Sequence, residues 1–377
     1  MIKIAVLPGD GIGPEIIEES LKVVESVSKK IDIKFDYKFC DVGAIAIDKY
    51  NNPLPDETLK ICKESDAVLF GAIGHPKFDN NPNLKIRPEQ GLLKLRKELG
   101  LYANLRPVKS YKELLSLSPL KKNIIENVDM LIVRELTGGL YFGEKKSSNT
   151  FSSDLCTYTV DEIERVTSIA IDFAKKRRNK ITLVDKANVL ETSRLWRKTV
   201  QEISLKHPEV ELDYMFVDNA AMQIILNPKQ FDVILTENLF GDIISDEASV
   251  IGGSIGILSS ASIGGSMGLF EPIHGSFPQA TNKNIANPVA AILSASMMLN
   301  YLNLGNGAKM IEKAVENSLI NKVSTADINN ISPSKTSQVG DYISNFIKEN
   351  NYILFSIFFV IFKLLFQIRQ CLNITKS

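Results

Sequence analysis

Cysteine is scarce in this chain, and its few cysteines do not form a recognisable motif. The 377 residues include four, Cys40, Cys62, Cys156 and Cys371. None of them forms a Cys-x-x-Cys pair, which is a common spacing for zinc ligands and redox-active dithiols. Because disulfides are also rare in large chains of reducing compartments, we expect free thiols.

A net charge is lacking as well, since 44 basic side chains balance 44 acidic ones. No overall field would attract nucleic acid or an anionic membrane surface, so we expect a small-molecule partner and no nucleic acid. The amino-terminal segment has no cationic start, long apolar run or cleavage site of a secretion signal. We therefore expect a cytoplasmic location.

Long apolar runs are absent except at the carboxyl end. Tyr352 to Ile368 contains Lys363 as its only charged residue and is slightly shorter than the roughly 20 residues that a helix needs to cross a bilayer. This tail is interpreted as a membrane anchor, an extra packing helix or translation past an altered stop codon. We favour the last two over membrane contact.

The remaining chain has the pattern of an α/β protein. At 377 residues and 44% apolar content, it is long enough for two domains. Helical periodicity is clearest over Val160–Arg178 and Ser193–Ser204. Short apolar runs predict strands at Ile2–Leu7, Ala67–Gly71, Met130–Glu135, Ile181–Asp185 and Val233–Thr236.

This alternation predicts a mostly parallel sheet covered by helices, with functional side chains in loops at the strand ends. The first such loop is Gly9-Asp10-Gly11-Ile12-Gly13-Pro14-Glu15. Its glycines permit a tight path that presents backbone amides to a ligand, and Pro14 suits the first position of a helix. The glycine spacing does not meet the Rossmann fingerprint, so a plain tight turn explains it equally well.

Cations occur at three places where a substrate carboxylate could bind. Arg96 lies one helical turn beyond Leu92 and Leu93, which places an apolar ledge beside a cation. Arg106 and Arg134 are expected near strand ends, and arginine suits bidentate carboxylate binding. Each arginine taken singly is also compatible with a surface role.

Two further residues have the chemistry of proton transfer. Tyr141 follows the Gly138-Gly139 turn and could donate a proton, although a buried structural tyrosine is the alternative. Lys186 follows a predicted strand and points an amine toward the carboxyl edge of the sheet, where it could act as a base.

Carboxylates and a polar loop complete the candidates. Asp242 and Asp246 share one helix face, and Asp218 ends an apolar strand pattern, so the three could hold magnesium. Glu271 to Ser276 and Ile285 to Pro288 frame a loop that could wrap an adenosine.

Together these segments resemble the β-decarboxylating dehydrogenases, the isocitrate and isopropylmalate dehydrogenase family, in order from about Ile2 to Asp341. The stretch Gly91-Leu92-Leu93-x-Leu95-Arg96 resembles the isopropylmalate branch. The implied reaction is oxidative decarboxylation of (2R,3S)-3-isopropylmalate to 4-methyl-2-oxopentanoate and CO2 with reduction of NAD, a step of leucine biosynthesis.

The resemblance also implies roles for single residues. Lys186 would take the hydroxyl proton and Tyr141 would protonate the enol. The substrate would contact Glu89, Leu92, Leu93, Arg96, Arg106, Arg134 and Asp218. Mg2+ or Mn2+ would be held by Asp218, Asp242 and Asp246. NAD would contact Ile12, His274, Gly275, Ser276, Gln279 and Asn287.

The implied fold is a two-domain α/β fold with a central mixed sheet, not a Rossmann fold. Residues 1–100 and 255–348 would form a discontinuous cofactor-binding domain, and residues 101–254 a central domain with the dimer interface and the metal and catalytic residues. Residues 349–377 lie outside the match. A homodimer with shared active sites is implied, in which Lys186 and Asp218 come from the partner subunit.

One departure concerns the cofactor, because Gln279 stands where NAD enzymes of the family carry an aspartate that holds the ribose. Residues 277–281 include no lysine or arginine for the phosphate of NADP, so NAD stays the expectation. Alternatives are a D-malate or tartrate dehydrogenase, a homoisocitrate dehydrogenase and a non-catalytic regulatory homologue. A third carboxylate against Leu92 and Leu93 disfavours homoisocitrate.

Overall fold

The computed structural model describes residues 1–79 and 84–350. Twelve strands lie in these residues: β1 (Ile2–Gly9), β2 (Phe35–Phe39), β3 (Ala67–Ala72), β4 (Ala103–Lys109), β5 (Asp129–Glu135), β6 (Lys145–Ser147), β7 (Ser152–Asp154), β8 (Lys180–Asp185), β9 (Glu211–Phe216), β10 (Val233–Thr236), β11 (Ser259–Gly264) and β12 (Met267–Pro272). The five strands predicted from sequence are confirmed within a few residues at each end.

The α-helices of the described residues are α1 (Gly13–Ile31), α2 (Ala44–Tyr50), α3 (Asp56–Lys63), α4 (Pro76–Asp79), α5 (Pro88–Glu98), α6 (Lys122–Ile125), α7 (Val160–Lys175), α8 (Glu191–Ser204), α9 (Val217–Leu226), α10 (Asn238–Ser249), α11 (Val289–Tyr301), α12 (Gly305–Ile320) and α13 (Thr336–Glu349). Short 3-10 helices include η2 (Gly139–Tyr141) and η6 (Pro278–Ala280).

Ten strands form one mixed sheet in the order β2-β1-β3-β12-β11-β4-β5-β10-β8-β9, which confirms the expected fold class. The pairs β12–β11, β11–β4 and β4–β5 are antiparallel, and the other neighbours are parallel. The first five strands in this order come from the two ends of the chain and the last five from residues 101–254. This order agrees with the division into two domains, which stays a prediction.

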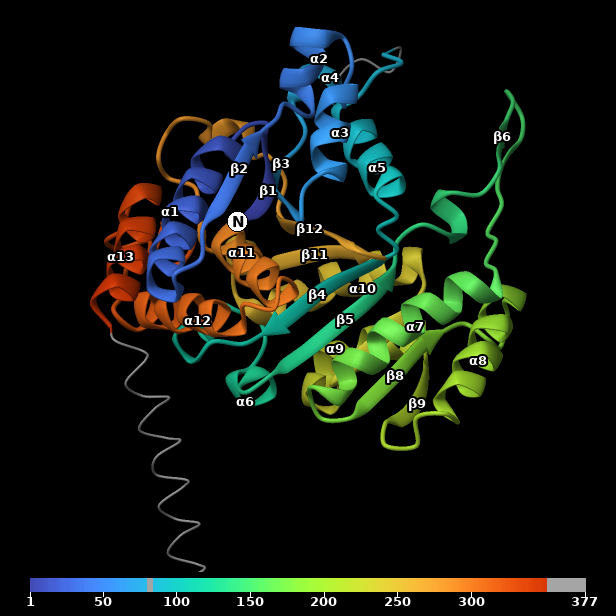
Figure 1. Cartoon of the computed structure of the whole chain (residues 1–377). Helices are drawn as coiled ribbons and strands as arrows, with labels where there is room; N and C mark the ends of the chain where they lie inside the picture. Colours follow the sequence, from blue (N-terminus) through green and yellow to red (C-terminus); the bar gives the residue numbers. More distant parts are fainter. Residues whose placement is uncertain (80–83, 351–377) are drawn as a thin grey trace, which may run out of the picture.

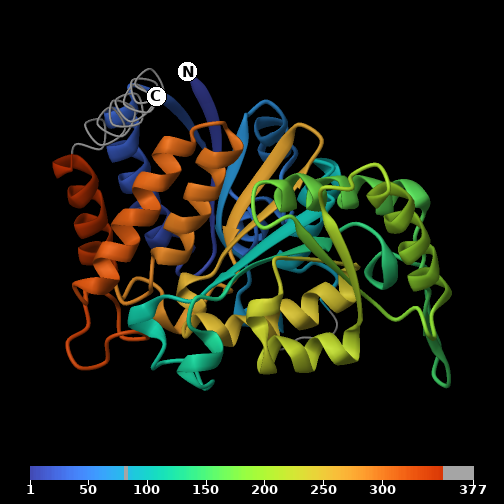
Figure 2. The same cartoon turned by 90° about the horizontal axis from the view of Figure 1, so that it is seen from below.

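Helices cover both faces of the sheet (Figures 1 and 2). In β5, Leu131 and Val133 face a core that includes Ile163 of α7. The alternate residues Met130 and Ile132 face a second core that includes Ile244 of α10. The alternation of a strand therefore places α7 and α10 on opposite faces. The β6–β7 hairpin projects from the body as an arm (Figure 1).

The boundaries of α7 follow from local chemistry. Thr159 and Glu162 form a reciprocal capping box at its start. The helix ends at Lys175, three residues before the predicted end, because Arg177 N bonds to Ala174 O and Asn179 adopts φ +57°. The predicted end at Arg178 is therefore wrong, and Arg177 instead pairs with Asp232 at 2.7 Å.

The apolar tail, Tyr352 to Ile368, lies outside the described residues. Within the described ranges, no helix is both long enough and apolar enough to span a membrane. The expected surface connection at 79–83 is described only at Asp79, the last residue of α4. That at 329–337 runs as a loop into α13, which begins at Thr336.

Candidate active site

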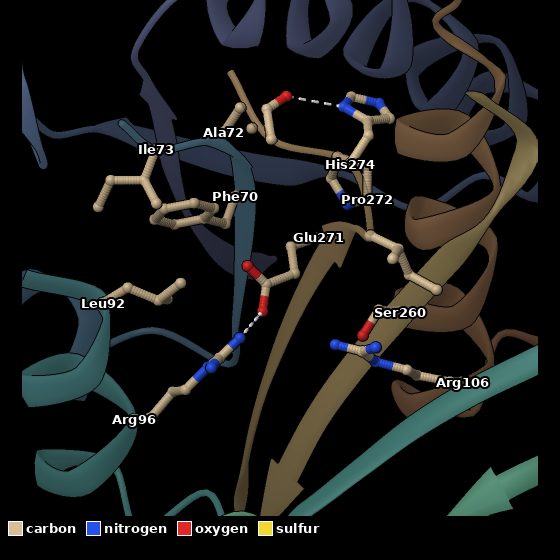
Figure 3. Close-up of a pocket in the computed structure, with 13 residues that line it drawn as sticks. Phe70, Ala72, Ile73, Leu92, Arg96, Arg106, Ser260, Glu271, Pro272 and His274 are labelled. Atoms are coloured by element: carbon tan, nitrogen blue, oxygen red, sulfur yellow. Dashed lines mark hydrogen bonds and ion pairs between the residues drawn. The ribbon is translucent and has the colours of Figure 1, made fainter. Parts of the chain in front are cut away.

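A pocket of about 140 Å³ opens where α5 faces the carboxyl ends of β3 and β12. Figure 3 shows its apolar wall, with Phe70, Ile73 and Leu92, and its polar wall, with Arg96 and Glu271. Arg106 reaches the same pocket from β4. Leu92 of the predicted ledge and two of the three predicted arginines therefore line one cavity.

Arg96 is held by a carboxylate that the sequence analysis did not assign. Its Nη2 donates to Glu271 Oε1 at 2.6 Å, and its Nε is buried without a partner among the described residues. Glu271 lies in β12, far away in sequence, and is only 6% exposed. Because Arg96 keeps an unfilled donor, it has capacity for a further acceptor.

The two leucines of the predicted ledge differ in position. Leu92 lines the pocket beside Arg96, whereas Leu93 is 47% exposed and is not among the lining residues. Glu89, in the first turn of α5, is exposed. Its carboxylate lies against Gly74: a Cβ built on Gly74 would be 3.1 Å from Glu89 Oε1. A contact of Leu93 or Glu89 with substrate stays a prediction.

Arg106 lies in the middle of β4, so its expected place near a strand end is wrong. Its Nε donates to Asn104 Oδ1 at 3.0 Å and its Nη1 to Ser245 Oγ at 2.6 Å. Nη1 also contacts Asp246 Oδ1 at 2.9 Å. The β4 position brings this cation against α10.

Arg134 and Tyr141 converge on Asp242. Arg134 Nη1 donates to Asp242 Oδ1 at 2.6 Å, while Nε donates to Asn238 O at 2.8 Å. Burial lowers the pKa of Arg134 to about 10, so it stays cationic at neutral pH. Tyr141 donates to Asp242 Oδ2 at 2.8 Å and is 41% exposed, which rules out a buried structural tyrosine.

Helix α10 is fixed at its start by a buried network. Glu237 accepts from Phe240 N at 2.7 Å and from Tyr158 Oη at 3.0 Å, and Tyr158 in turn accepts from Asn238 N at 3.0 Å. Burial raises the pKa of Glu237. This network sets where Asp242 and Asp246 stand, four residues apart on one face.

Lys186 and Asp218 form a pair of their own. Lys186 directly follows β8, as predicted, and Asp218 lies in the first turn of α9 rather than at the end of a strand. Lys186 Nζ donates to Asp218 Oδ1 at 2.6 Å, and this hydrogen bond lowers the pKa of Asp218. The pair is separate from the arginines that hold Asp242 and Asp246.

The three aspartates therefore do not gather within one chain. Among the described residues, no group of three acidic, histidine or cysteine side chains is placed to hold a metal ion. Asp242 and Asp246 are both hard oxygen donors, and the side chain of Asp246 is 71% exposed. Two such donors fit part of a magnesium or manganese site, with further oxygens still to be supplied.

Three backbone amides of the glycine loop after β1 donate hydrogen bonds within the protein. Asp10 N bonds to Ala72 O, Ile12 N to Ser276 O and Gly13 N to Asp10 O, at 2.8, 2.8 and 2.9 Å. These three amides are therefore already paired, which favours the alternative of a plain tight turn over amides that face a ligand. Gly11 has φ +60°, and an added Cβ would collide with Ser276 O, so this close approach requires glycine.

The second predicted loop contributes one unfilled group. His274 lines the pocket, and its Nε2 is buried without a partner among the described residues. Burial also lowers the pKa of His274, which favours the neutral ring. Gly275 lines the pocket as well, and Gln279, in η6, is exposed. A buried nitrogen without a partner beside an open pocket fits a polar ligand.

Asn287 is hydrogen-bonded to Asp327, a residue that the sequence did not point to. Its Nδ2 donates to Asp327 Oδ2 at 2.9 Å, and its Oδ1 accepts from Val289 N at 3.0 Å. Ser276 and Ile12 are buried, at 7% and 3% exposure. Contacts of these three with a cofactor stay predictions.

Comparison with known proteins agrees with this geometry. The family model described as isocitrate/isopropylmalate dehydrogenase matches residues 3–343. A 3-isopropylmalate dehydrogenase of Bacteroides fragilis strain YCH46 is 52% identical over 92% of this chain and 99% of its own length. One of Carboxydothermus hydrogenoformans is 54% identical over 91% and 94%.

A solved structure agrees as well. The isocitrate dehydrogenase of Methylococcus capsulatus superposes with a TM-score of 0.82 at 34% identity, covering 93% of this chain and 100% of that one. The chain belongs to the isocitrate/isopropylmalate dehydrogenase family.

Proposed function

We propose that the protein catalyses oxidative decarboxylation of (2R,3S)-3-isopropylmalate to 4-methyl-2-oxopentanoate and CO2, with reduction of NAD, in leucine biosynthesis. The observation that carries this proposal is the pocket in which Leu92 and Phe70 stand beside Arg96 and Arg106. It offers an apolar surface to a branched side group and cations to two carboxylates. More than half identity to relatives named 3-isopropylmalate dehydrogenase supports it.

Substrate binding would replace ion pairs within the protein by ion pairs between the arginines and the substrate. Arg96, Arg106 and Arg134 are balanced by Glu271, Asp246 and Asp242. A dicarboxylate would compete for these guanidinium groups, and Arg96 Nε, which has no partner within residues 1–79 and 84–350, would donate to it. The arginines orient the substrate through the directional donors of their planar groups.

A divalent ion, Mg2+ or Mn2+, would be held by Asp242 and Asp246 together with Asp218 of the partner subunit. When bound, it polarises the substrate oxygen and stabilises the negative charge left by loss of CO2. Lys186 of the partner subunit would take the hydroxyl proton. Tyr141 would return a proton to the enol. Its partial burial, and next its hydrogen bond to Asp242, raise the pKa of Tyr141, so the hydroxyl is protonated at neutral pH.

A shared site requires a homodimer, and exposed apolar side chains support one. Several of them lie on or next to elements that carry proposed site residues, namely Val189 and Leu190 after β8, Met222 and Leu226 on α9, and Ile243 on α10, and two more, Phe151 and Leu155, lie at the arm. Large apolar side chains left uncovered on neighbouring elements are typical of a subunit interface.

The proposed cofactor is NAD, bound near Ile12, His274, Gly275, Ser276, Gln279 and Asn287. His274 Nε2 has no hydrogen-bond partner in the part of the chain that the structure describes, which supports a polar ligand beside the pocket. An exposed Gln279 can hydrogen-bond a ribose hydroxyl, whereas residues 277–281 provide no cation for a phosphate.

The test is NADH formation at 340 nm with Mg2+, offering 3-isopropylmalate, D-malate, isocitrate and homoisocitrate, each with NAD or NADP. Burying the three carbons of an isopropyl group is worth about 2.4 kcal/mol, which is on the order of fifty-fold over D-malate. Preference for 3-isopropylmalate and NAD is the expected result. Preference for D-malate would contradict the assignment of Leu92, and absence of turnover would favour a non-catalytic homologue.

A further inference from the structure

A second pocket, of about 360 Å³, is lined by Lys97, Gly100, Tyr102, Thr137, Phe142 and Arg165. None of these residues lines the candidate active site. Arg165 belongs to α7, whereas Asp242 and Asp246 belong to α10, on the opposite face of the sheet. This cavity is therefore distinct from the site described above.

Arg165 presents an incompletely satisfied cation to this pocket. Its Nη2 donates to Thr137 Oγ1 at 2.7 Å, and its guanidinium lies 4.6 Å from the centroid of the Tyr102 ring. Its Nε is buried without a partner among the described residues. The side chain as a whole is 38% exposed, so its other N–H groups can donate to an anionic ligand in the pocket.

Glu135, the carboxylate that pairs with Arg165, already accepts other hydrogen bonds. It stands 3.8 Å from Arg165 Nη2 and accepts hydrogen bonds from Thr137 N, Thr137 Oγ1 and Gly138 N at 2.8, 2.8 and 2.7 Å. Burial raises the pKa of Glu135 and thereby disfavours its charged form. Glu135 is therefore closer to the donors of the following turn than to Arg165.

The other walls define the kind of molecule that fits. Lys97, near the end of α5, adds a second cation, and Tyr102 and Phe142 add aromatic surface. Phe142 is 41% exposed, so its ring is open to further contact. Two cations beside aromatic rings suit a ligand with one negative group and an apolar body.

The pocket also adjoins the candidate active site through one short turn. Thr137 and Phe142 line the second pocket, whereas Tyr141 reaches Asp242 at 2.8 Å. A molecule that contacts both ends of this turn would restrict the segment that positions Tyr141.

We propose that the second pocket binds a small monocarboxylate with an apolar body, held by Arg165 and Lys97, and that its occupation rigidifies the turn from Thr137 to Phe142. This binding does not depend on which substrate the active site takes. The ligand is recognised by charge-assisted hydrogen bonds at one end and aromatic contact at the other.

Titration calorimetry of the full chain with phenylacetate tests the proposal. Phenylacetamide, which has nearly the same shape without the charge, is expected to bind at least about tenfold more weakly. Arg165→Gln should weaken phenylacetate binding about tenfold, and Lys97→Gln several-fold. Lys175→Gln removes a charge from α7 at a residue paired with Glu209 and should leave binding unchanged.

Hydrogen exchange supplies a readout of the turn. Phenylacetate should slow exchange in the peptide that spans residues 137–142. At a concentration that half-saturates wild type, this slowing should be smaller in Lys97→Gln, whose exposed site makes a folding defect easy to avoid. Wild-type affinity in both Lys97→Gln and Arg165→Gln would overturn the proposal. Loss of binding in Arg96→Gln alone would do the same, because it would place phenylacetate in the active-site pocket.

Discussion

Leu92 and Leu93 are neighbours on α5, but only Leu92 lines the pocket with Arg96. Leu92→Ala removes part of the apolar wall, so kcat/KM for 3-isopropylmalate should fall about tenfold, with little change for D-malate, which has no isopropyl group. Leu93→Ala is the matched control. Equal losses with both substrates would contradict a side-group contact, and an equal effect of Leu93→Ala would restore Leu93 as a second contact.

His274 predicts how stability depends on pH. Burial lowers its pKa below the ordinary value of 6.5. As pH falls through 6.5, the unfolded chain binds this proton before the folded chain does, so stability decreases until the folded-state pKa is passed. The urea midpoint of His274→Asn should therefore drop less than that of wild type between about pH 7.5 and 5.

The surface histidine His207, which contacts Lys175 and Glu209, provides the comparison. The urea midpoint of His207→Asn shows what the same substitution does away from the pocket. If His274→Asn lost as much stability as wild type over this range, burial of His274 would not be the cause.

Among the elements, α10 depends on the cap at its start. Tyr158→Phe removes the hydroxyl that donates to Glu237 and accepts from Asn238 N, leaving two buried groups without this partner. The free energy of unfolding should decrease by about 1–3 kcal/mol. Urea unfolding measures this, with the exposed Tyr50→Phe as control; a change no larger than that of the control would show that the cap is dispensable.

The element scale also shows what sequence alone could predict. The strands β1, β3, β5, β8 and β10 were predictable because their apolar runs are buried on both faces. Strands β11 and β12 were missed because their hairpin depends on long-range pairing with β4 and β3. That pairing brings Glu271 to Arg96, a contact between residues 175 positions apart that no local pattern indicates.

The residues of the candidate site also divide into those that the sequence could predict and those that it could not. Arg96, Arg106 and Leu92 were predictable as a group because the family resemblance covers the segments that carry them, and the structure places all three in one pocket. The partners Asn104, Ser245 and Glu271 were not, because ordinary polar residues acquire this role only through strand register and helix packing. The internal bonding of the loop at Ile12 likewise depends on a distant carbonyl, that of Ser276.

At the scale of the whole molecule, Lys186 and Asp218 lie apart from Asp242 and Asp246 within one chain. The proposed reaction therefore requires two chains to form a dimer. Leu226→Glu places a charge on the exposed face of α9, where Leu226 is 62% exposed. Burying that unpaired charge in an interface is unfavourable, so the variant should be monomeric by light scattering. It should stay folded by circular dichroism and lose nearly all turnover.

The control for this prediction is Ile320→Glu, which introduces the same charge at the end of α12, where Ile320 is 59% exposed and remote from the proposed interface elements. It should remain dimeric and active. A monomeric Leu226→Glu variant with full activity would contradict a shared site. It would mean that Lys186 and Asp218 reach Asp242 and Asp246 of the same chain. A dimeric and active Leu226→Glu would instead place the interface elsewhere, since a buried glutamate at α9 would not be tolerated without cost.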